Sequence, residues 1–280
     1  QELEVNKSIL KTGVKYPEID IQKEINECNR WTLTFGEYTL TTDTQEEYLK
    51  TLAFARMIGY LITDGHLSFK HNQGSVFLGH DLDVKQFLND LKQFQTIVQK
   101  KFISKNLFEV RFRSTFVRSL LKLKGLTHGK KSTQEAVLPE FIMDDNCPKP
   151  IIREFLGGLF GGDGHTCYLG LHRGKRDILT SVSFSQTKSS AHLKSLYKMM
   201  ENLQSLLKKC GINKTTIQKH KETTHSKNNV NGKYDSRTHS QVLLHLDITE
   251  LIPFSEKVGF RYCCHKSQRL SAGVSYRHLR

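Results

Sequence analysis

The sequence lacks long apolar runs, closely spaced cysteine pairs and an apolar leader. No apolar run approaches the roughly 20 residues that a membrane-spanning helix needs. The six cysteines form no C-x-x-C pair, so disulfides and a structural zinc site are both poorly supported. Cys263, Cys264 and His265 are interpreted as a partly buried strand end, with metal binding as the alternative. The first residues lack the charged and apolar regions of a signal peptide, and the missing initiator methionine suggests an excised fragment.

Positive charge is what the sequence has in excess. The formal net charge is +14 over 280 residues. The first fifty residues hold 6 basic and 10 acidic side chains, so the other 230 hold 36 and 18, a net charge of +18. This body fits a polyanionic partner such as nucleic acid. A merely soluble, solvated surface is the alternative.

One motif occurs twice, about a hundred residues apart. Residues 57–65 and 156–164 are apolar runs that end in Asp-Gly, and a histidine follows each run. Each run places small residues four apart, on one face of a helix, where they allow two helix backbones to approach closely. We therefore expect the two runs to pack on each other and to bring Asp64 and Asp163 side by side. The small pairs are Gly59 with Thr63 and Gly158 with Gly162.

The pattern of apolar residues around each motif predicts a duplicated domain of order α-β-β-α-β-β-α. The capping box at residues 44–47 opens the first motif helix, which Asp64-Gly65 ends. Helical spacing predicts a further helix over residues 83–100 of the first half. The boundaries predicted from these patterns are an N-terminal appendage (1–43), a first half (44–135), a linker (136–150) and a second half (151–280).

Two neighbouring carboxylates have a specific chemical consequence. They repel each other and cannot both stay ionised at low cost unless a cation lies between them. Magnesium typically binds one or two protein carboxylates together with substrate phosphates, and such sites support in-line displacement at a phosphodiester. A lone Asp-Gly is interpreted as a turn or helix stop. Two copies in a duplicated, basic chain favour nucleic acid cleavage.

Residues 58–65 and 156–164 resemble the motif of the LAGLIDADG (dodecapeptide) homing endonucleases, and the resemblance covers about residues 45–275. It implies a mixed α/β (α+β) fold: a monomeric, pseudo-twofold saddle with two antiparallel sheets and a central two-helix interface. It also implies Mg²⁺-dependent cleavage of both strands of a long double-stranded DNA site, with Mn²⁺ or Ca²⁺ able to substitute in binding. No membrane partner is expected. The metal-binding residues that it implies are Asp64, Asp163 and the glycine after each, Gly65 and Gly164.

The resemblance also implies catalytic residues beside the aspartates. Lys131 and Lys266 match the family's lysines near the scissile phosphates, with a surface lysine as the alternative for each. Gln186 resembles a polar residue that helps to position water or metal, and His80 stands at the place in the first half that we match to it. Residues 258–266 look most like intein-borne endonucleases, including those of eukaryotic nuclear inteins, which implies an intracellular setting in a nucleus or organelle.

The expected DNA contacts lie on the sheet face and its loops. Arginines there would read guanine edges and lysines would contact phosphates. The main alternative is a protein on the same scaffold that binds nucleic acid without cleaving it, either an RNA maturase or a transcription regulator. The predicted contact residues are Lys70, His71, Gln73, His80, Arg111 and Arg113 in the first half, and Arg173, Lys175, Arg176, Lys219, Lys221, Lys233 and Arg237 in the second.

Overall fold

The structure, a computed structural model, describes residues 30–172, 175–224 and 238–279. Its two halves follow the same order of elements. The first half comprises α3 (Gln45–Asp64), β3 (Gly65–Ser68), β4 (Gln73–Leu78), α4 (Asp81–Lys92), β5 (Ile97–Ser104), β6 (Leu107–Arg113) and α5 (Thr115–Leu120). The second comprises α7 (Lys149–Asp163), β7 (Gly164–His165), β10 (Ser183–Ser189), α8 (Leu193–Lys209), β11 (Thr215–Thr224), β12 (Thr238–Leu246) and α9 (Leu251–Lys257).

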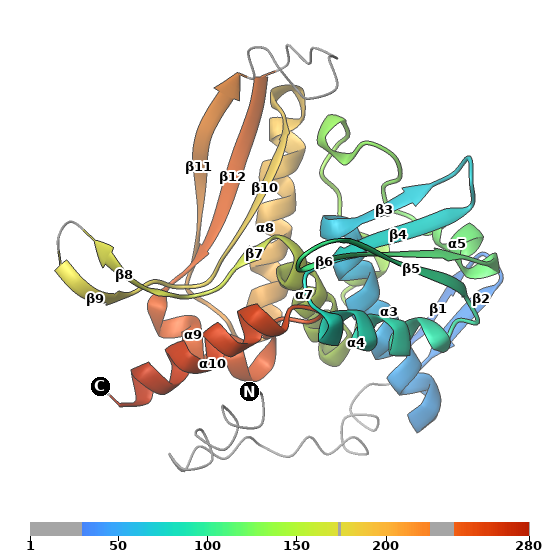
Figure 1. The fold of residues 1–280 in the computed structure, drawn as a ribbon, viewed down its shortest axis with the longest axis horizontal. Helices are drawn as coiled ribbons and strands as arrows, with labels where there is room; N and C mark the ends of the chain where they lie inside the picture. The colour runs from blue at the N-terminus through green and yellow to red at the C-terminus, as the bar shows by residue number, and fades with distance from the viewer. Residues whose placement is uncertain (1–29, 173–174, 225–237, 280) are drawn as a thin grey trace.

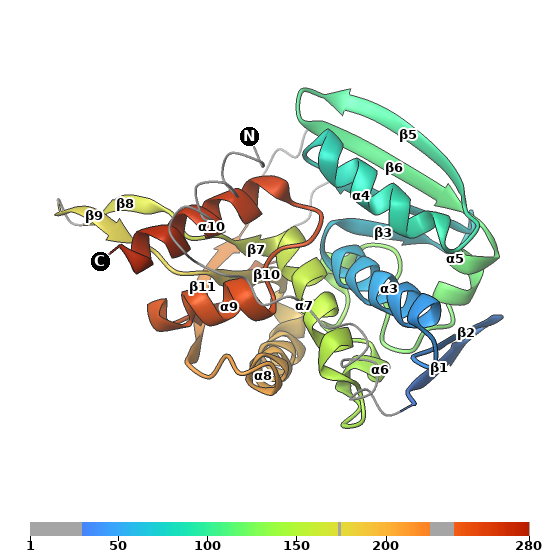
Figure 2. The same cartoon turned by 90° about the horizontal axis from the view of Figure 1, so that it is seen from below.

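Each half contains a four-stranded antiparallel sheet. The strand orders are β3-β4-β6-β5 and β11-β12-β10-β7. The two sheets lie on either side of α3 and α7 (Figures 1 and 2). Helix α4 packs on the first sheet and α8 on the second. The predicted α/β fold with two antiparallel sheets is confirmed. No helix within the described residues is long and apolar enough to cross a membrane.

Smaller elements complete the chain. They are the hairpin β1 (Thr32–Phe35) and β2 (Tyr38–Thr41), the 3-10 turns η1 (Lys131–Thr133), η2 (Ser190–His192) and η3 (Ile248–Glu250), the short helix α6 (Glu140–Met143), the ribbon β8 (Leu169–His172) and β9 (Lys175–Leu179), and the helix α10 (Cys264–His278). The hairpin is built into the first half, because Trp31, Phe35 and Leu40 are buried in its core. Phe35 lies 4.8 Å from Phe54 of α3 between ring centroids.

The motif helices α3 and α7 pack through their glycines. A Cβ added at Gly59 would overlap the Phe155 carbonyl oxygen, and one at Gly158 would overlap the Arg56 carbonyl oxygen. Each glycine Cα thus lies directly against a carbonyl of the opposite helix, a contact geometry that recurs between closely packed helices. The predicted close packing of the two motifs is confirmed. It fixes both halves around one axis.

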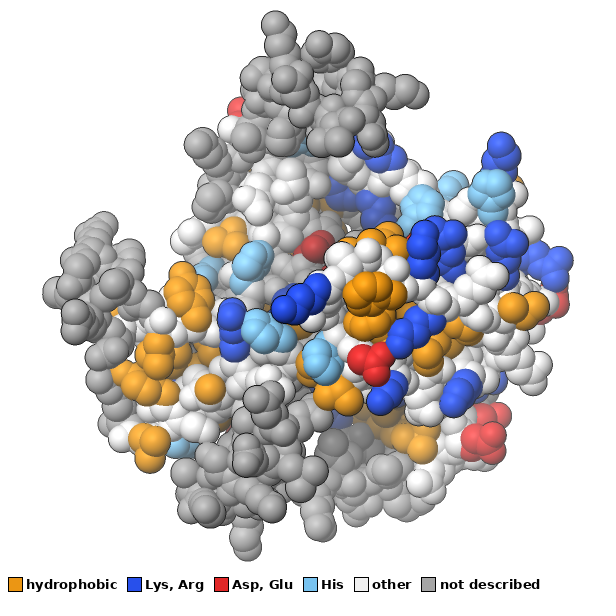
Figure 3. Space-filling model, in the orientation of Figure 1, with side chains coloured by type: hydrophobic (Ala, Val, Ile, Leu, Met, Phe, Trp, Pro, Cys, Tyr) orange, Lys and Arg blue, Asp and Glu red, His pale blue; other side chains and the backbone are white. Residues whose placement is uncertain are grey.

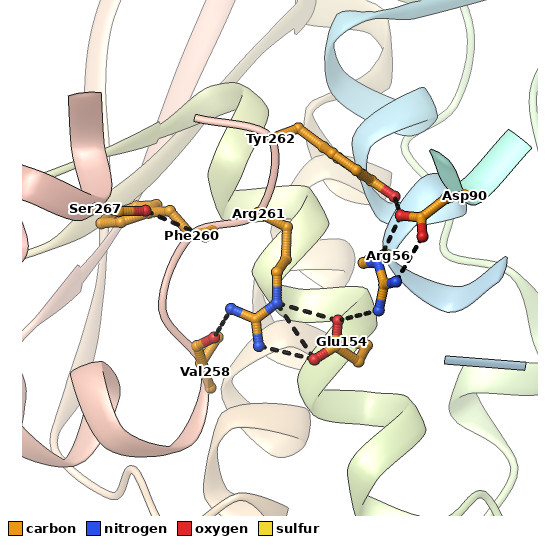
Figure 4. Close-up of polar contacts among 8 residues, drawn as sticks. All are labelled: Arg56, Asp90, Glu154, Val258, Phe260, Arg261, Tyr262 and Ser267. Atoms are coloured by element: carbon orange, nitrogen blue, oxygen red, sulfur yellow. Dashed lines mark hydrogen bonds and ion pairs between the residues drawn. The ribbon is translucent and has the colours of Figure 1, made fainter. Parts of the chain in front are cut away.

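A partly buried ionic network joins the halves behind these helices (Figure 4). Glu154 of α7 accepts hydrogen bonds from Arg261, at 2.8 Å from Nη2 to Oε1, and from Arg56 of α3 at 3.2 Å. Arg56 also binds Asp90 of α4 through two nitrogens, Nε at 2.7 Å and Nη2 at 2.6 Å. The Tyr262 hydroxyl donates to the same Asp90 carboxylate. One chain of contacts therefore ties α4, α3, α7 and the segment before α10 together.

Two predictions of secondary structure are wrong. The helix expected over residues 83–100 is α4, which ends at Lys92, and β5 begins at Ile97. The chain turns at Gln95, whose φ of 48° ends the helix, and the apolar spacing continues into the strand by coincidence. Cys263 and Cys264 are not a strand end: Cys263 is the N-cap of α10, a helix that no sequence signal indicated.

Candidate active site

Asp64 and Asp163 are the last residues of α3 and α7, and both point into the junction between the helices. A Cβ added at Gly162 would lie 3.1 Å from Asp64 Oδ2, so the Asp64 carboxylate reaches the end of the opposite helix. Burial and then the charge of Asp163 raise the pKa of Asp64 to about 6. Burial also raises the pKa of Asp163, although Gln186, Lys266 and Lys131 oppose the shift. The predicted juxtaposition of the two aspartates is confirmed.

Lys131 and Lys266 occupy equivalent places at the two helix ends. Lys131 Nζ donates to the carbonyls of Ile62 at 2.9 Å and Thr63 at 3.3 Å, and also to that of Leu61. Lys266 Nζ donates to Gly161 O at 2.7 Å and Phe160 O at 3.4 Å, and also to Gly162 O. The last carbonyls of a helix have no partner within it and carry its negative dipole end, so each ammonium is a favourable C-terminal cap.

Both lysines also lie within electrostatic range of both aspartates. Burial lowers the pKa of Lys131 to about 8, although Asp163 and Asp64 oppose the shift. Burial likewise lowers the pKa of Lys266, against the charges of Asp64 and Asp163. Neither side chain is a solvated surface lysine. Lys131 and Lys266, which match each other in the sequence, therefore also occupy equivalent positions in the two halves of the structure.

Gln186 lies beside Asp163, and its amide Nε2 is 3.3 Å from Asp163 Oδ2. The match of His80 to Gln186 is wrong. Gly65 pairs with Val76 and Gly164 pairs with Phe184, so the residue equivalent to Gln186 is Leu78, which is fully buried and apolar. His80 instead accepts from the Leu82 amide at 3.1 Å and caps α4. The site is therefore symmetric in its aspartates and lysines but not in this polar residue.

The donor set suits a hard divalent cation. Among the residues that the structure describes, no group of three or more His, Cys, Asp or Glu side chains could hold a metal ion, which leaves the two carboxylates. Gly65 and Gly164 allow tight turns there, because a Cβ at Gly65 would lie 2.6 Å from Leu61 Cα and one at Gly164 would overlap Phe160 O. A half-buried, mutually repelling carboxylate pair fits a cation that completes its coordination with substrate phosphate and water.

The first-half candidates for DNA contact are exposed or half-buried. Gln73 and Arg113 pair across β4 and β6, and Arg113 Nη2 donates to Gln73 Oε1 at 2.7 Å. Arg111 lies on the same face of β6 and donates to Glu109 at 2.8 Å. Lys70 and His71 lie in the exposed turn between β3 and β4. Figure 3 shows Lys and Arg side chains gathered over the half that carries this sheet.

The second-half candidates cannot be placed in the same way. Arg173, Lys233 and Arg237 lie outside the described residues. Lys175 and Arg176 belong to β9, and Lys219 and Lys221 to β11, but their side chains also lie outside the part that the structure describes. These contacts remain predictions.

Sequence reasoning missed several residues around the site. Lys188 of β10 is only 6% exposed and donates to Lys131 O at 2.6 Å. Asp83 of α4 is 2% exposed and accepts from the Cys264 amide at 2.8 Å. Gln99 and Lys101 of β5 are exposed and pair with Arg111 and Glu109. The alternation of side chains along β5 would have indicated Gln99 and Lys101, but the start of this strand was predicted to be part of a helix.

Comparison with known proteins gives one family match and several distant likenesses. The model of the LAGLIDADG-like domain matches residues 150–252. The replication factor C small subunit of Methanocaldococcus jannaschii is 28% identical over 166 residues, which cover 54% of this chain and 9% of that protein. The chain thus matches only a small part of this curated relative.

The solved structures similar to this chain include two kinds of protein. Full-length DUF199/WhiA from Thermatoga maritima has a TM-score of 0.45 at 13% identity, covering 93% of this chain and 67% of that one. I-DmoI in complex with DNA and Ca has a TM-score of 0.44 at 14% identity, covering 82% and 98%. The family match to the second half is the informative one, and the first half repeats the motif helix, antiparallel sheet and capping lysine of the second. The second half of the chain thus matches the LAGLIDADG-like domain over residues 150–252.

Proposed function

We propose that this protein is a site-specific endonuclease that hydrolyses both strands of a long double-stranded DNA site with the help of a divalent cation. The observation that carries the proposal is the pair of half-buried aspartates at the joined ends of α3 and α7, each with a lysine on its own helix end. A protein that only binds nucleic acid has no need to hold two like charges together in this way. The basic body supplies the attraction for DNA.

Asp64 and Asp163 would hold the cation, for which Mg²⁺ is the natural choice and Mn²⁺ or Ca²⁺ are substitutes in binding. Bound there, such an ion would activate water and stabilise the leaving oxygen of an in-line displacement. Because the cation would offset the repulsion between the two carboxylates, it would also favour their ionised forms. The Gln186 amide keeps the Asp163 carboxylate oriented in the second half.

The symmetry of the site suits a duplex. The two strands of DNA are related by local twofold axes, and the two aspartate–lysine sets are related by the axis between α3 and α7. Each half would therefore act on one scissile phosphate. Lys131 and Lys266 place positive charge beside these positions, where it stabilises the charge that develops during phosphodiester hydrolysis. Gln73, Arg111 and Arg113 would contact bases or phosphates from the sheet.

Binding without cleavage is the second candidate, and one observation favours it. The first half has apolar Leu78 where the second half has Gln186, so one of the two half-sites lacks a polar group beside its aspartate. A regulator or maturase on this scaffold would retain the basic sheets and tolerate such a loss.

The test is selection of cleaved sites from a randomised duplex library in Mg²⁺, followed by cleavage and binding assays on the selected site. We expect double-strand cuts from the wild type, and loss of cutting with retained DNA binding in Asp64→Asn and Asp163→Asn. Binding by the wild type without cleavage of any sequence in Mg²⁺ or Mn²⁺ would favour the second candidate. Metal-dependent cutting by the double variant would contradict the assigned site.

A further inference from the structure

We infer that each active-site lysine is held in position by the opposite half of the molecule, and that Lys188 and Asp83 are the positioning residues that control the two strands separately. This inference rests on the proposed nuclease function and concerns residues that the motif does not contain. It arises from two sets of contacts that cross between the halves, one around Lys131 and one around Lys266.

The segment that carries Lys131 belongs to the first half but is fastened to the second. Its own carbonyl accepts from Lys188 Nζ of β10 at 2.6 Å. The carbonyl of Thr133, at the end of η1, lies 3.0 Å from His192 Nε2. The Ala136 amide donates to Ser195 Oγ at 3.0 Å. Three second-half side chains therefore fix the path of the chain along η1 and just after it.

The segment that carries Lys266 belongs to the second half but is fastened to the first. Helix α10 begins two residues before Lys266, and its N-cap residue, Cys263, provides no side-chain cap. Asp83 of α4 takes that role, because its Oδ1 accepts from the Cys264 amide at 2.8 Å. The Tyr262 hydroxyl donates to Asp90 of the same helix. Helix α4 thus fixes the start of α10 and with it the position of Lys266.

Lys188 is the more unusual of the two residues. It is almost fully buried, and burying an ammonium carries a large desolvation penalty. Its ammonium donates to the backbone carbonyl of Lys131, and the nearby charge of Asp163 favours its protonated form. A packing role alone would be filled better by an apolar side chain. The contact that the ammonium makes is the one that holds Lys131 in register with Asp163.

The two sets of contacts are independent of each other. Lys188, His192 and Ser195 contact the Lys131 segment, whereas Asp83 and Asp90 contact the segment before Lys266, and Asp90 also binds Arg56. Displacing one lysine therefore leaves the other in place. If each lysine serves one strand, loosening one set slows the cutting of one strand and converts a double-strand nuclease into a nickase of defined polarity.

The experiment compares strand cutting on a supercoiled plasmid that carries the selected site, with the two strands labelled separately. For Lys188→Met we expect accumulation of nicked circle, with one strand cut about 10- to 100-fold more slowly and the other within about twofold of wild type. His192→Ala is expected to slow the same strand. Asp83→Ala is expected to slow the opposite strand, while Asp83→Asn, which keeps the acceptor oxygen, should cut both strands nearly as wild type does.

The matched controls are Lys209→Met, which removes an ion pair with Asp145 elsewhere on the second half, and Asp247→Ala, which removes the cap of η3. Both should leave the ratio of strand rates unchanged. Equal slowing of both strands by Lys188→Met and Asp83→Ala, or slowing of the same strand by both, would overturn the inference.

A second measurement does not depend on cleavage and separates the inference from the proposed function. Amide hydrogen exchange should rise about tenfold in peptides covering residues 128–136 of Lys188→Met, and in peptides covering residues 262–268 of Asp83→Ala, without the converse changes. If the wild type cuts no DNA, the proposed function fails, yet this exchange pattern still tests the cross-half contacts. Unchanged exchange in both segments would refute those contacts as positioning devices.

Discussion

At the scale of single residues, the electrostatics of Asp64 is the feature that most directly links the fold to the proposed chemistry. Its pKa of about 6 lies above the ordinary value of 3.8, so the folded protein binds a proton more tightly than the unfolded chain does. The corresponding stability is present at low pH and is lost as the pH rises from about 4 to about 6. At neutral pH the metal-free protein therefore carries an unfavourable buried charge.

Asp64→Asn should relieve that charge. At pH 7.5 without metal, we expect the variant to be more stable than wild type by about 1–3 kcal/mol, and to be close to wild type near pH 4. Addition of Mg²⁺ should raise the melting temperature of wild type at pH 7.5, but much less at pH 5, where protons compete for the carboxylate, and not at all in the variant. Thermal and urea unfolding with and without Mg²⁺ measure both effects. A variant less stable than wild type at pH 7.5 would contradict the assigned pKa.

The site residues that could be predicted from the sequence are those that lie in a pattern that occurs twice. Asp64, Asp163, Lys131 and Lys266 were accessible because each occurs in a pattern that appears twice. Lys188 has no such signal, since a lysine at the end of one strand looks like any surface lysine until the fold buries it. The match of His80 to Gln186 failed because the strand pairing aligns Val76 with Phe184, two residues away from the alignment of the two sequences. Strand register is set by pairing in the folded structure, which the local sequence does not show.

At the scale of elements, the contact between α3 and α7 depends on glycine. Gly158→Ala places a Cβ against the Arg56 carbonyl, which is backbone and cannot rotate away. We expect a loss of about 3 kcal/mol or more from overpacking and separation of the helices, and a loss of cleavage with it. Equilibrium unfolding in urea measures the change.

Gly79→Ala is the matched control for this substitution. Its added Cβ would meet only Asn106 O, at an ordinary contact distance of 3.9 Å. The stability should change by less than about 1 kcal/mol. Similar losses for the two variants would show that the interface is less tightly packed than its geometry indicates.

The elements themselves were predictable where local signals agree. The capping box before α3 is formed as expected, with the Glu47 amide donating to Thr44 Oγ1 at 3.2 Å. Helix α10 was missed because its N-terminal cap comes from Asp83, more than 180 residues away in the chain. A cap supplied from another half leaves no mark in the local sequence. The end of α4 was missed because the apolar spacing runs on into β5.

At the scale of the whole molecule, Glu154 joins the halves through Arg56 and Arg261. Burial raises its pKa, but the two arginines outweigh burial and lower the pKa below its usual range. A lowered pKa means that the stability from this group is present above about pH 4.5 and is lost as the pH falls through the folded-state pKa.

Glu154→Gln leaves Arg56 bound to Asp90 but leaves Arg261 without its carboxylate partner. We expect a loss of about 1–3 kcal/mol at pH 7, because the half-buried guanidinium of Arg261 loses its counter-charge. The difference from wild type should shrink as the pH falls through the lowered pKa of Glu154, where the wild-type carboxylate also becomes protonated. Unfolding curves between pH 3 and pH 8 test this, and a loss that does not vary with pH would contradict the role of charge.

The glycine contacts between α3 and α7 have a consequence for how this molecule can change over evolution. The contacts at Gly59 and Gly158 join a Cα to a main-chain oxygen, so the helix packing at these two positions does not depend on side-chain complementarity. The outer strands of each half can then accumulate substitutions independently, while the glycines keep the aspartates together. A duplicated chain of this kind can change the proposed DNA-contacting surface of one half at a time while Asp64 and Asp163 keep their places at the centre.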